Sequence, residues 1–136
     1  MPHGSCLCEA VRYETNGPLE GIDHCHCSMC RRAHGSAFST YGRVLRERVR
    51  VEDPTGSLVW YGSSEPVQRG FCGKCGSSLF FRHAAAADFD FIAVGTLDDD
   101  PGARPEAHIF VASKASWYTI EDDLPQHEAY PPGVAD

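Results

Sequence analysis

Seven cysteines in a chain of 136 residues constrain this sequence more than any other feature. They form three groups in the order Cys6 and Cys8, then Cys25, Cys27 and Cys30, then Cys72 and Cys75. Closely spaced cysteines in a reducing compartment are typical of metal binding or thiol chemistry rather than of disulfides. Their odd number also excludes complete pairing within one chain. The sequence therefore predicts sites for a thiophilic metal, most simply Zn²⁺.

The middle group has the spacing of a compact three-sulfur site. Residues two apart on a strand point to the same face, so Cys25 and Cys27 share one face. Two spacer residues then allow a turn that brings Cys30 back toward them. Three protein ligands are typical of a catalytic zinc, whose fourth position takes water or substrate. We therefore expect Cys25, Cys27 and Cys30 to hold a zinc with an open position.

The two outer pairs together supply four sulfurs, the number that a closed structural zinc requires. Cys6 and Cys8 again lie two apart, and Cys72 and Cys75 are each followed by a glycine that lets the backbone turn around a metal. We therefore expect these four cysteines to share one structural zinc, and the chain to bind two zinc ions in all.

Two other readings of the cysteines remain open. A histidine could close the middle site; His24 and His26 alternate with the cysteines and point away from it, whereas His34 lies within reach. Cys72 and Cys75 could form a redox pair, although their glycine-rich, strand-like surroundings differ from the helix start that such pairs occupy.

Composition limits the class of protein. The chain is 42% hydrophobic and 23% charged, as in ordinary globular proteins. We expect a single domain over residues 1–136, with about 121–136 as an extended tail laid over the surface or disordered. No apolar run approaches the roughly 20 residues that cross a bilayer, and the N-terminus lacks the features of a signal peptide. We therefore expect a cytoplasmic protein without a membrane partner.

Charge argues against nucleic acid as a partner. The formal net charge is −7, and the sequence has no long basic cluster, whereas nucleic-acid surfaces are normally basic. Oligomeric state does not follow from the sequence.

The hydrophobic pattern indicates a mainly β fold with one short helical turn after the middle cysteines. Ser28 is the expected N-cap of a turn over 29–34, and Gly35 is expected to end it. We expect the strand at 20–27 to run back as the partner of the strand at 10–14. Further strands are expected at 37–44, 58–61, 67–71, 78–82, 89–94 and 108–111.

Ordered blocks along the chain resemble the glutathione-dependent formaldehyde-activating enzyme family, which also includes centromere protein V. The blocks are 4–8 with 11–13, 25–32 with Gly35 and Ser36, 69–77, 95–98, 108–111 with Ser113, Lys114, Ala115 and Trp117, and 122–125. Because they cover nearly the whole chain in the same order, the resemblance is specific.

The resemblance implies a β-tent fold of stacked antiparallel sheets bridged by a structural zinc. It implies this zinc on Cys6, Cys8, Cys72 and Cys75 and a second, more labile zinc on Cys25, Cys27 and Cys30, the partition already reached by counting. The implied activity is that of a carbon–sulfur lyase, which joins formaldehyde to the thiol of glutathione or reverses that reaction. The identities of this chain's thiol and aldehyde do not follow from it.

Other residues near the cysteines have two readings each. Arg31 and Arg32 could pair with substrate carboxylates, or they could be solvated, with one of them packed against the sheet. Lys114 and Trp117 could line a pocket, although a tryptophan at such a place more often belongs to the core.

Three functions are consistent with this pattern. The first is a zinc-dependent lyase acting on a thiol–aldehyde adduct, with a thiol such as glutathione and an aldehyde as partners. The second is a non-catalytic, zinc-stabilised binding module. The third is a zinc or thiol redox sensor, in which oxidation of the middle cysteines releases metal.

Overall fold

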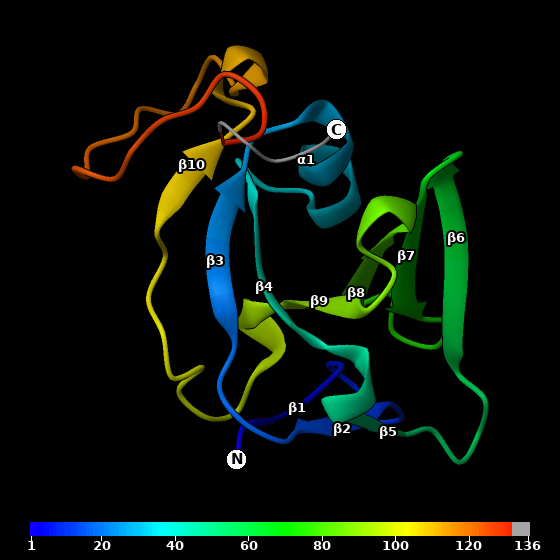
Figure 1. Ribbon diagram of the computed structural model, residues 1–136. Helices are drawn as coiled ribbons and strands as arrows, with labels where there is room; N and C mark the ends of the chain where they lie inside the picture. The colour runs from blue at the N-terminus through cyan, green and yellow to red at the C-terminus, as the bar shows by residue number, and fades with distance from the viewer. Residues whose placement is uncertain (132–136) are drawn as a thin grey trace.

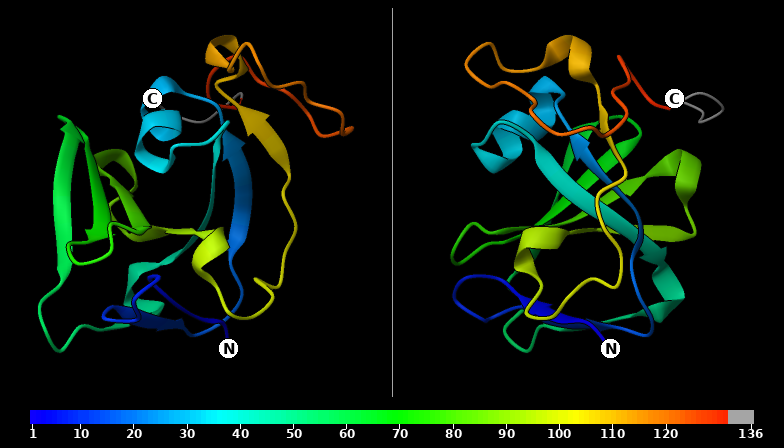
Figure 2. Two further views of the ribbon diagram at one scale, coloured as in Figure 1. Left: turned by 180° about the vertical axis from the view of Figure 1, so that it is seen from behind. Right: turned by 90° about the vertical axis from the view of Figure 1, so that its left-hand side faces the viewer.

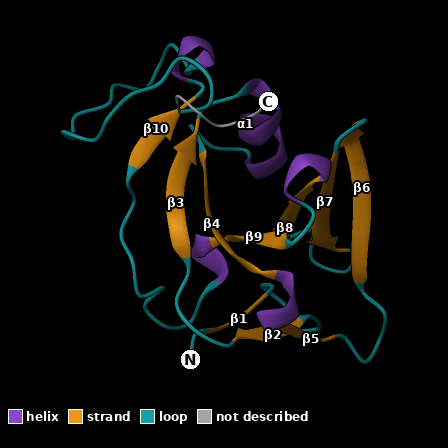
Figure 3. Ribbon diagram, in the orientation of Figure 1, coloured by secondary structure: helices purple, strands orange, loops and turns teal. Residues whose placement is uncertain are grey.

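The structure, a computed structural model, describes residues 1–131 of the chain (Figure 1). Its strands are β1 (His3–Ser5), β2 (Arg12–Thr15), β3 (Glu20–Cys25), β4 (Ser39–Leu45), β5 (Val49–Glu52), β6 (Leu58–Ser64), β7 (Val67–Cys72), β8 (Ser78–His83), β9 (Phe89–Ala93) and β10 (Ala107–Ile109). The helical segments are α1 (Ser28–His34) and four short 3₁₀ turns, η1 (Arg46–Arg48), η2 (Ala84–Ala86), η3 (Val94–Thr96) and η4 (Val111–Ser113). The predicted mainly β class is confirmed, and Figure 3 shows how little of the chain is helical.

The strands form a seven-stranded sheet in the order β10-β3-β4-β9-β8-β7-β6 and a three-stranded sheet in the order β1-β2-β5. In Figure 1, β10, β3 and β4 stand on one side of the molecule, β8, β7 and β6 stand on the other, and the small sheet lies beneath them. All pairings are antiparallel except that of β10 with β3, which is parallel and departs from the expected purely antiparallel sheets.

The expected pairing of 10–14 with 20–27 is wrong. β2 pairs with β1 and β5 in the small sheet, whereas β3 pairs with β4 and β10 in the large sheet. The intervening segment does not form a hairpin turn, because it carries the chain from one sheet to the other. The backbone N–H of Asn16 donates to the Arg48 carbonyl and that of Leu19 donates to the Pro101 carbonyl, so neither bond joins β2 to β3. The Leu19 side chain is buried.

The cysteines contribute to two hydrophobic clusters, the two outer pairs to one and the middle group to the other. One cluster contains Cys6 and Cys72 together with core residues such as Phe80 and Ile92. The other contains Cys25 and Cys30 together with Tyr41, Ala93 and Ile109. The fold therefore sets the two sites into separate parts of the core.

Helix α1 begins directly after Cys27. The N-cap is Cys27 and not Ser28 as expected, because the Cys27 Sγ accepts the backbone N–H of Cys30 at 3.2 Å. The sulfur thus does the work that a serine hydroxyl usually does at this position. Gly35 ends the helix as predicted, in the left-handed conformation with φ of 60°, and its N–H bonds the Arg31 carbonyl.

The C-terminal segment, as far as the structure describes it, lies along β10 (Figure 2). Two backbone hydrogen bonds of 2.9 Å join this segment to β10. The His108 N–H donates to the Pro125 carbonyl, and the His127 N–H donates to the His108 carbonyl. The Tyr130 ring packs edge-on against Phe110. Residues 125–130 therefore pack against β10 and the residues that follow it, while 132–136 of the expected tail lie outside the described residues. No described helix is long and apolar enough to cross a membrane.

Candidate metal centres

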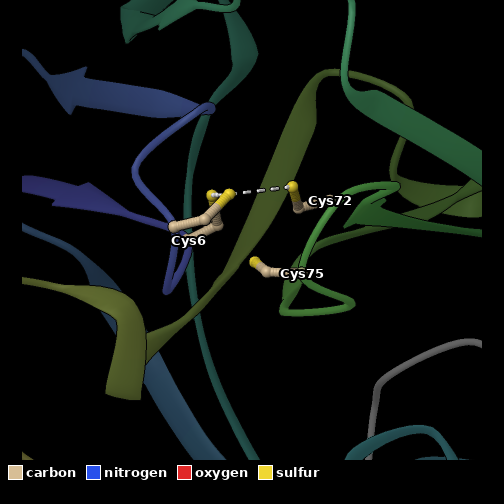
Figure 4. Close-up of side chains that lie close together, drawn as sticks. Cys6, Cys72 and Cys75 are labelled. Carbon is tan, nitrogen blue, oxygen red and sulfur yellow. Dashed lines mark hydrogen bonds between the residues drawn. The ribbon is translucent and has the colours of Figure 1, made fainter.

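The four-cysteine cluster consists of Cys6, Cys8, Cys72 and Cys75, whose sulfur atoms all lie within 4.8 Å of one another. The Sγ atoms of Cys6 and Cys8 are 3.7 Å apart, and those of Cys8 and Cys72 are 3.8 Å apart. A tetrahedron of Zn–S bonds of about 2.3 Å has edges of about 3.8 Å. Figure 4 shows the side chains of Cys6, Cys72 and Cys75 directed toward a common centre. The spacing therefore fits a tetrahedral thiophilic ion.

Two turns far apart in sequence build this cluster. Cys6 and Cys8 lie between β1 and β2, whereas Cys72 ends β7 and Cys75 lies before β8. Backbone N–H groups point at the buried sulfurs, from Val11 to Cys6 Sγ and from Lys74 to Cys72 Sγ, each at 3.4 Å. Such donors stabilise thiolates.

Ser77 joins the two turns of the four-cysteine cluster. Its hydroxyl bonds Cys75 Sγ at 3.2 Å and accepts the backbone N–H of Leu7 at 2.9 Å. The hydrogen bond from Ser77 lowers the pKa of Cys75 to about 5. A metal held here would tie the small sheet to the large one.

The three-cysteine cluster consists of Cys25, Cys27 and Cys30, whose sulfur atoms also lie within 4.8 Å of one another. Cys25 ends β3, Cys27 caps α1 and Cys30 lies in its first turn. Cys25 and Cys30 are buried, with 9% and 3% of their surface exposed. The cup predicted from the spacing is thus present, at the junction of a strand and a helix.

No protein group completes this cup among residues 1–131, because the group of potential ligands contains only the three cysteines. The Nε2 of His34, the histidine expected to be within reach, is hydrogen-bonded to the Tyr41 hydroxyl at 2.8 Å. His24 bonds Thr40 and His26 bonds His108, so both point away from the cup, as strand alternation predicted.

The sulfurs of the three-cysteine cluster are electrostatically unequal. Hydrogen bonds from the Cys25 and Cys27 thiols lower the pKa of Cys30, and the Ser39 hydroxyl and the Arg69 guanidinium lower it further. Donating to Cys27 and Cys30 raises the pKa of Cys25. Cys30 is therefore the sulfur on which hydrogen-bond donors and a guanidinium converge.

Behind the cup, three side chains form a chain of hydrogen bonds. Asp122 accepts from His108 Nε2 at 2.9 Å, and His108 Nδ1 lies 2.8 Å from His26 Nε2. Because the carboxylate can only accept, His108 must accept in turn from His26 Nε2–H. The C-terminal segment thereby holds the residue between Cys25 and Cys27. Burial lowers the pKa of His26 to about 4, so the ring stays neutral.

The other candidate site residues are two arginines of α1 together with Lys114 and Trp117. Arg31 is half-buried, with no hydrogen-bond partner for its Nε among the described residues, and Arg32 is exposed. Lys114 Nζ donates to the carbonyls of Ala115 and Tyr118 and so stabilises the turn to which it belongs. Trp117 is 70% exposed and therefore does not belong to the core.

Sequence reasoning missed the contact of Arg69 with Cys30. The Arg69 nitrogens Nη1 and Nη2 each lie 3.6 Å from the Cys30 sulfur. Arg69 is 39 residues away from Cys30 in the chain, and no local pattern could have paired them.

The donor sets fit zinc. Thiolates are soft ligands that favour zinc over hard ions such as magnesium or calcium. Four converging sulfurs satisfy a closed tetrahedral site, and three satisfy a site with one free position.

Comparisons with known proteins place this chain among relatives that share most of its length. The family model described as glutathione-dependent formaldehyde-activating enzyme matches residues 1–113. An uncharacterized lyase of Schizosaccharomyces pombe is 26% identical over 133 residues, which cover 88% of this chain and 91% of that protein. A Halomonas elongata protein named for glutathione-dependent formaldehyde activation is 26% identical over 125 residues, covering 87% and 80%.

A solved structure shares the fold. The crystal structure of a Rhodobacter sphaeroides protein superposes with a TM-score of 0.61 at 24% identity, over 76% of this chain and 91% of that one. The family match covers the greater part of the chain and includes every cysteine of both clusters. The chain therefore belongs to the glutathione-dependent formaldehyde-activating enzyme family.

Proposed function

We propose that the chain is a zinc-dependent carbon–sulfur lyase that forms or breaks the bond between a thiol sulfur and an aldehyde carbon. In the forward direction a thiol adds to the carbonyl carbon, the C=O double bond becomes a C–O single bond, and the thiol proton ends on the oxygen. The names of the relatives, a lyase in one and glutathione-dependent formaldehyde activation in the other, support this reaction class.

The observation that carries the proposal is the incomplete ligand set of the three-cysteine cluster. Its three sulfurs converge within 4.8 Å, and no histidine, aspartate or glutamate of residues 1–131 joins them. A zinc held there would lower the pKa of an incoming thiol and keep it as a nucleophilic thiolate near neutral pH. Three anionic protein ligands weaken Lewis acidity, which favours this role over polarisation of the aldehyde oxygen.

The protein residues around the cup would exclude water and bind the rest of the substrate. Partly buried aromatic side chains from four segments pack against the hydrophobic core cluster that contains Cys25 and Cys30; they are Phe81, Phe91, Phe110 and Tyr130. Arg31 and Arg32 lie on α1, the helix that carries Cys30. Their guanidinium groups are the candidates for pairing with carboxylates of a peptide thiol such as glutathione.

The four-cysteine cluster would be the structural centre. It lies in a different hydrophobic cluster from the three-cysteine cup and joins turns of both sheets. Cys72 is fully buried, so exchange of a ligand there would disturb the core.

The test is magnetisation-exchange NMR of a thiol and formaldehyde with zinc-loaded protein. We expect the protein to accelerate adduct formation and Cys27→Ser to abolish the acceleration. If Arg32 binds a carboxylate, Arg32→Ala should raise the KM for glutathione about tenfold and leave that for 2-mercaptoethanol unchanged. Arg12→Ala, which removes an exposed arginine of β2 paired with Glu9, is the matched control. Absence of acceleration with every thiol tested would contradict the lyase and favour a binding module.

A further inference from the structure

The guanidinium of Arg69 is fixed against the three-cysteine cluster. Arg69 lies in the middle of β7, with Nη1 and Nη2 each 3.6 Å from Cys30 Sγ. Its Nε donates to Ser63 Oγ at 3.0 Å, and its Cζ lies 5.2 Å from the centre of the Phe81 ring. Each part of the side chain therefore has its own neighbour, which holds the positive charge at the sulfur.

Arg69 has no carboxylate partner among residues 1–131, where the other ion pairs of arginine are to Asp or Glu. A half-buried cation requires a compensating anion. Both Nη atoms of Arg69 face the Cys30 sulfur at 3.6 Å, so a Cys30 thiolate is the anion placed to compensate this cation. The pair is built for a thiolate rather than for a neutral thiol.

The contact between Arg69 and Cys30 would change the net charge of the three-cysteine cluster when zinc is bound there. Three thiolates and one Zn²⁺ carry −1, and the Arg69 guanidinium brings the total to zero. The four-cysteine cluster would carry −2, and no arginine or lysine side chain of the described residues bonds its sulfurs. The two centres therefore differ in net charge as well as in ligand number.

We propose that Arg69 is a positioning residue that anchors Cys30 and enables the fourth position of the three-cysteine cluster to accept an anionic sulfur ligand. The inference rests on the proposed function, because it requires zinc in that cluster. A thiol that binds there releases its proton to solvent and adds one negative charge. With Arg69 the site passes from zero to −1, and without Arg69 it passes from −1 to −2. Arg69 thus lowers the electrostatic cost of thiolate binding.

The test measures ligand binding and needs no turnover. The labile site of the full-length protein is refilled with Co²⁺ and titrated with 2-mercaptoethanol, while the sulfur-to-cobalt charge-transfer band is recorded. We expect Arg69→Met to weaken thiol binding by about tenfold to 100-fold, the range found for partners of metal ligands. Arg69→Lys keeps the charge and should recover most of the affinity.

Two features of the titration separate an effect on sulfur from general disturbance. Loss of N–H···S bonds raises the energy of the sulfur lone pairs, so the band of the metal-loaded Arg69→Met protein should move to longer wavelength. Arg43→Met is the matched control, because Arg43 also lies over a ring, with Cζ 5.1 Å from the centre of Phe89, but pairs with Glu20 and contacts no cysteine. It should leave both band and affinity unchanged.

The inference is overturned if Arg69→Met binds 2-mercaptoethanol within twofold of the unmodified chain, or if Arg43→Met weakens binding equally. If Arg69→Met does not fold, Arg69→Gln removes the charge and retains a donor, and it must show the same loss. A lyase with Arg69-independent thiol binding would refute only this inference. Arg69-dependent thiol binding without acceleration of adduct formation would refute only the lyase. A wild-type band that does not respond to thiol would refute both.

Discussion

At the residue scale, the two clusters should respond differently to loss of one sulfur. Cys72 is fully buried in the core and Cys27 is half-buried at the start of a helix. A structural zinc is worth on the order of 10 kcal/mol, as much as the whole stability of a small domain. We therefore expect Cys72→Ser to unfold the chain and Cys27→Ser to retain the fold, as measured by circular dichroism and thermal melting. A folded Cys72→Ser protein would contradict the structural assignment.

Tyr13 should make stability fall at alkaline pH. Burial raises its pKa to about 12, and its hydroxyl lies 2.6 Å from Thr96 Oγ1. The unfolded chain loses this proton near pH 10 while the folded chain keeps it, so the contribution is complete below pH 10 and is lost toward pH 12. The wild-type free energy of unfolding should fall by up to about 3 kcal/mol more than that of Tyr13→Phe across this interval. Parallel curves for the two proteins would show that Tyr13 does not titrate differently on folding.

The sequence was sufficient to predict which cysteines group together, but not which other side chains surround them. Residues two apart on a strand share a face, and this rule alone joined Cys25 to Cys27 and sent His26 to the other side. Ser39 and Arg69 approach Cys30 only because β4 and β7 belong to the same bent sheet as β3. Such contacts depend on the order of strands, which no local pattern encodes.

At the element scale, helix α1 depends on the residue that ends it. Gly35 has a φ of 60°, and a Cβ added there would have no heavy atom within 4 Å, so only the backbone would resist a side chain. We expect Gly35→Ala to destabilise the protein by about 1 kcal/mol. Gly95→Ala is the matched control, because Gly95 also has open space but not a positive φ. Equal melting temperatures for the two variants would mean that the cap does not stabilise α1.

Local elements were predicted better than their connections. The helix end at Gly35 and the hairpin of β6 and β7 follow from turn residues and alternation, and both are present. The helix start was displaced by one residue because a cysteine sulfur replaces the usual hydroxyl cap. The segment between β2 and β3 has the composition of a turn, yet it crosses between sheets because Leu19 is drawn into the core.

At the scale of the whole molecule, β7 connects the two centres. Cys72 at its end belongs to the four-cysteine cluster, and Arg69 in its middle contacts the three-cysteine cluster. A metal bound to the four-cysteine cluster would therefore order a strand on which the three-cysteine cluster depends, so we expect metal to be lost in a fixed order. Fold class was predictable from composition and spacing, but this link required the three-dimensional arrangement of the sheet.

The most direct test of two unequal centres is the zinc content per chain during incubation with a mild chelator, with circular dichroism recorded on the same sample. The account predicts two zinc ions at the start and loss of one while the β signal persists, since only the three-cysteine cluster has a free position. Retention of both ions, or unfolding in step with loss of the first, would contradict it.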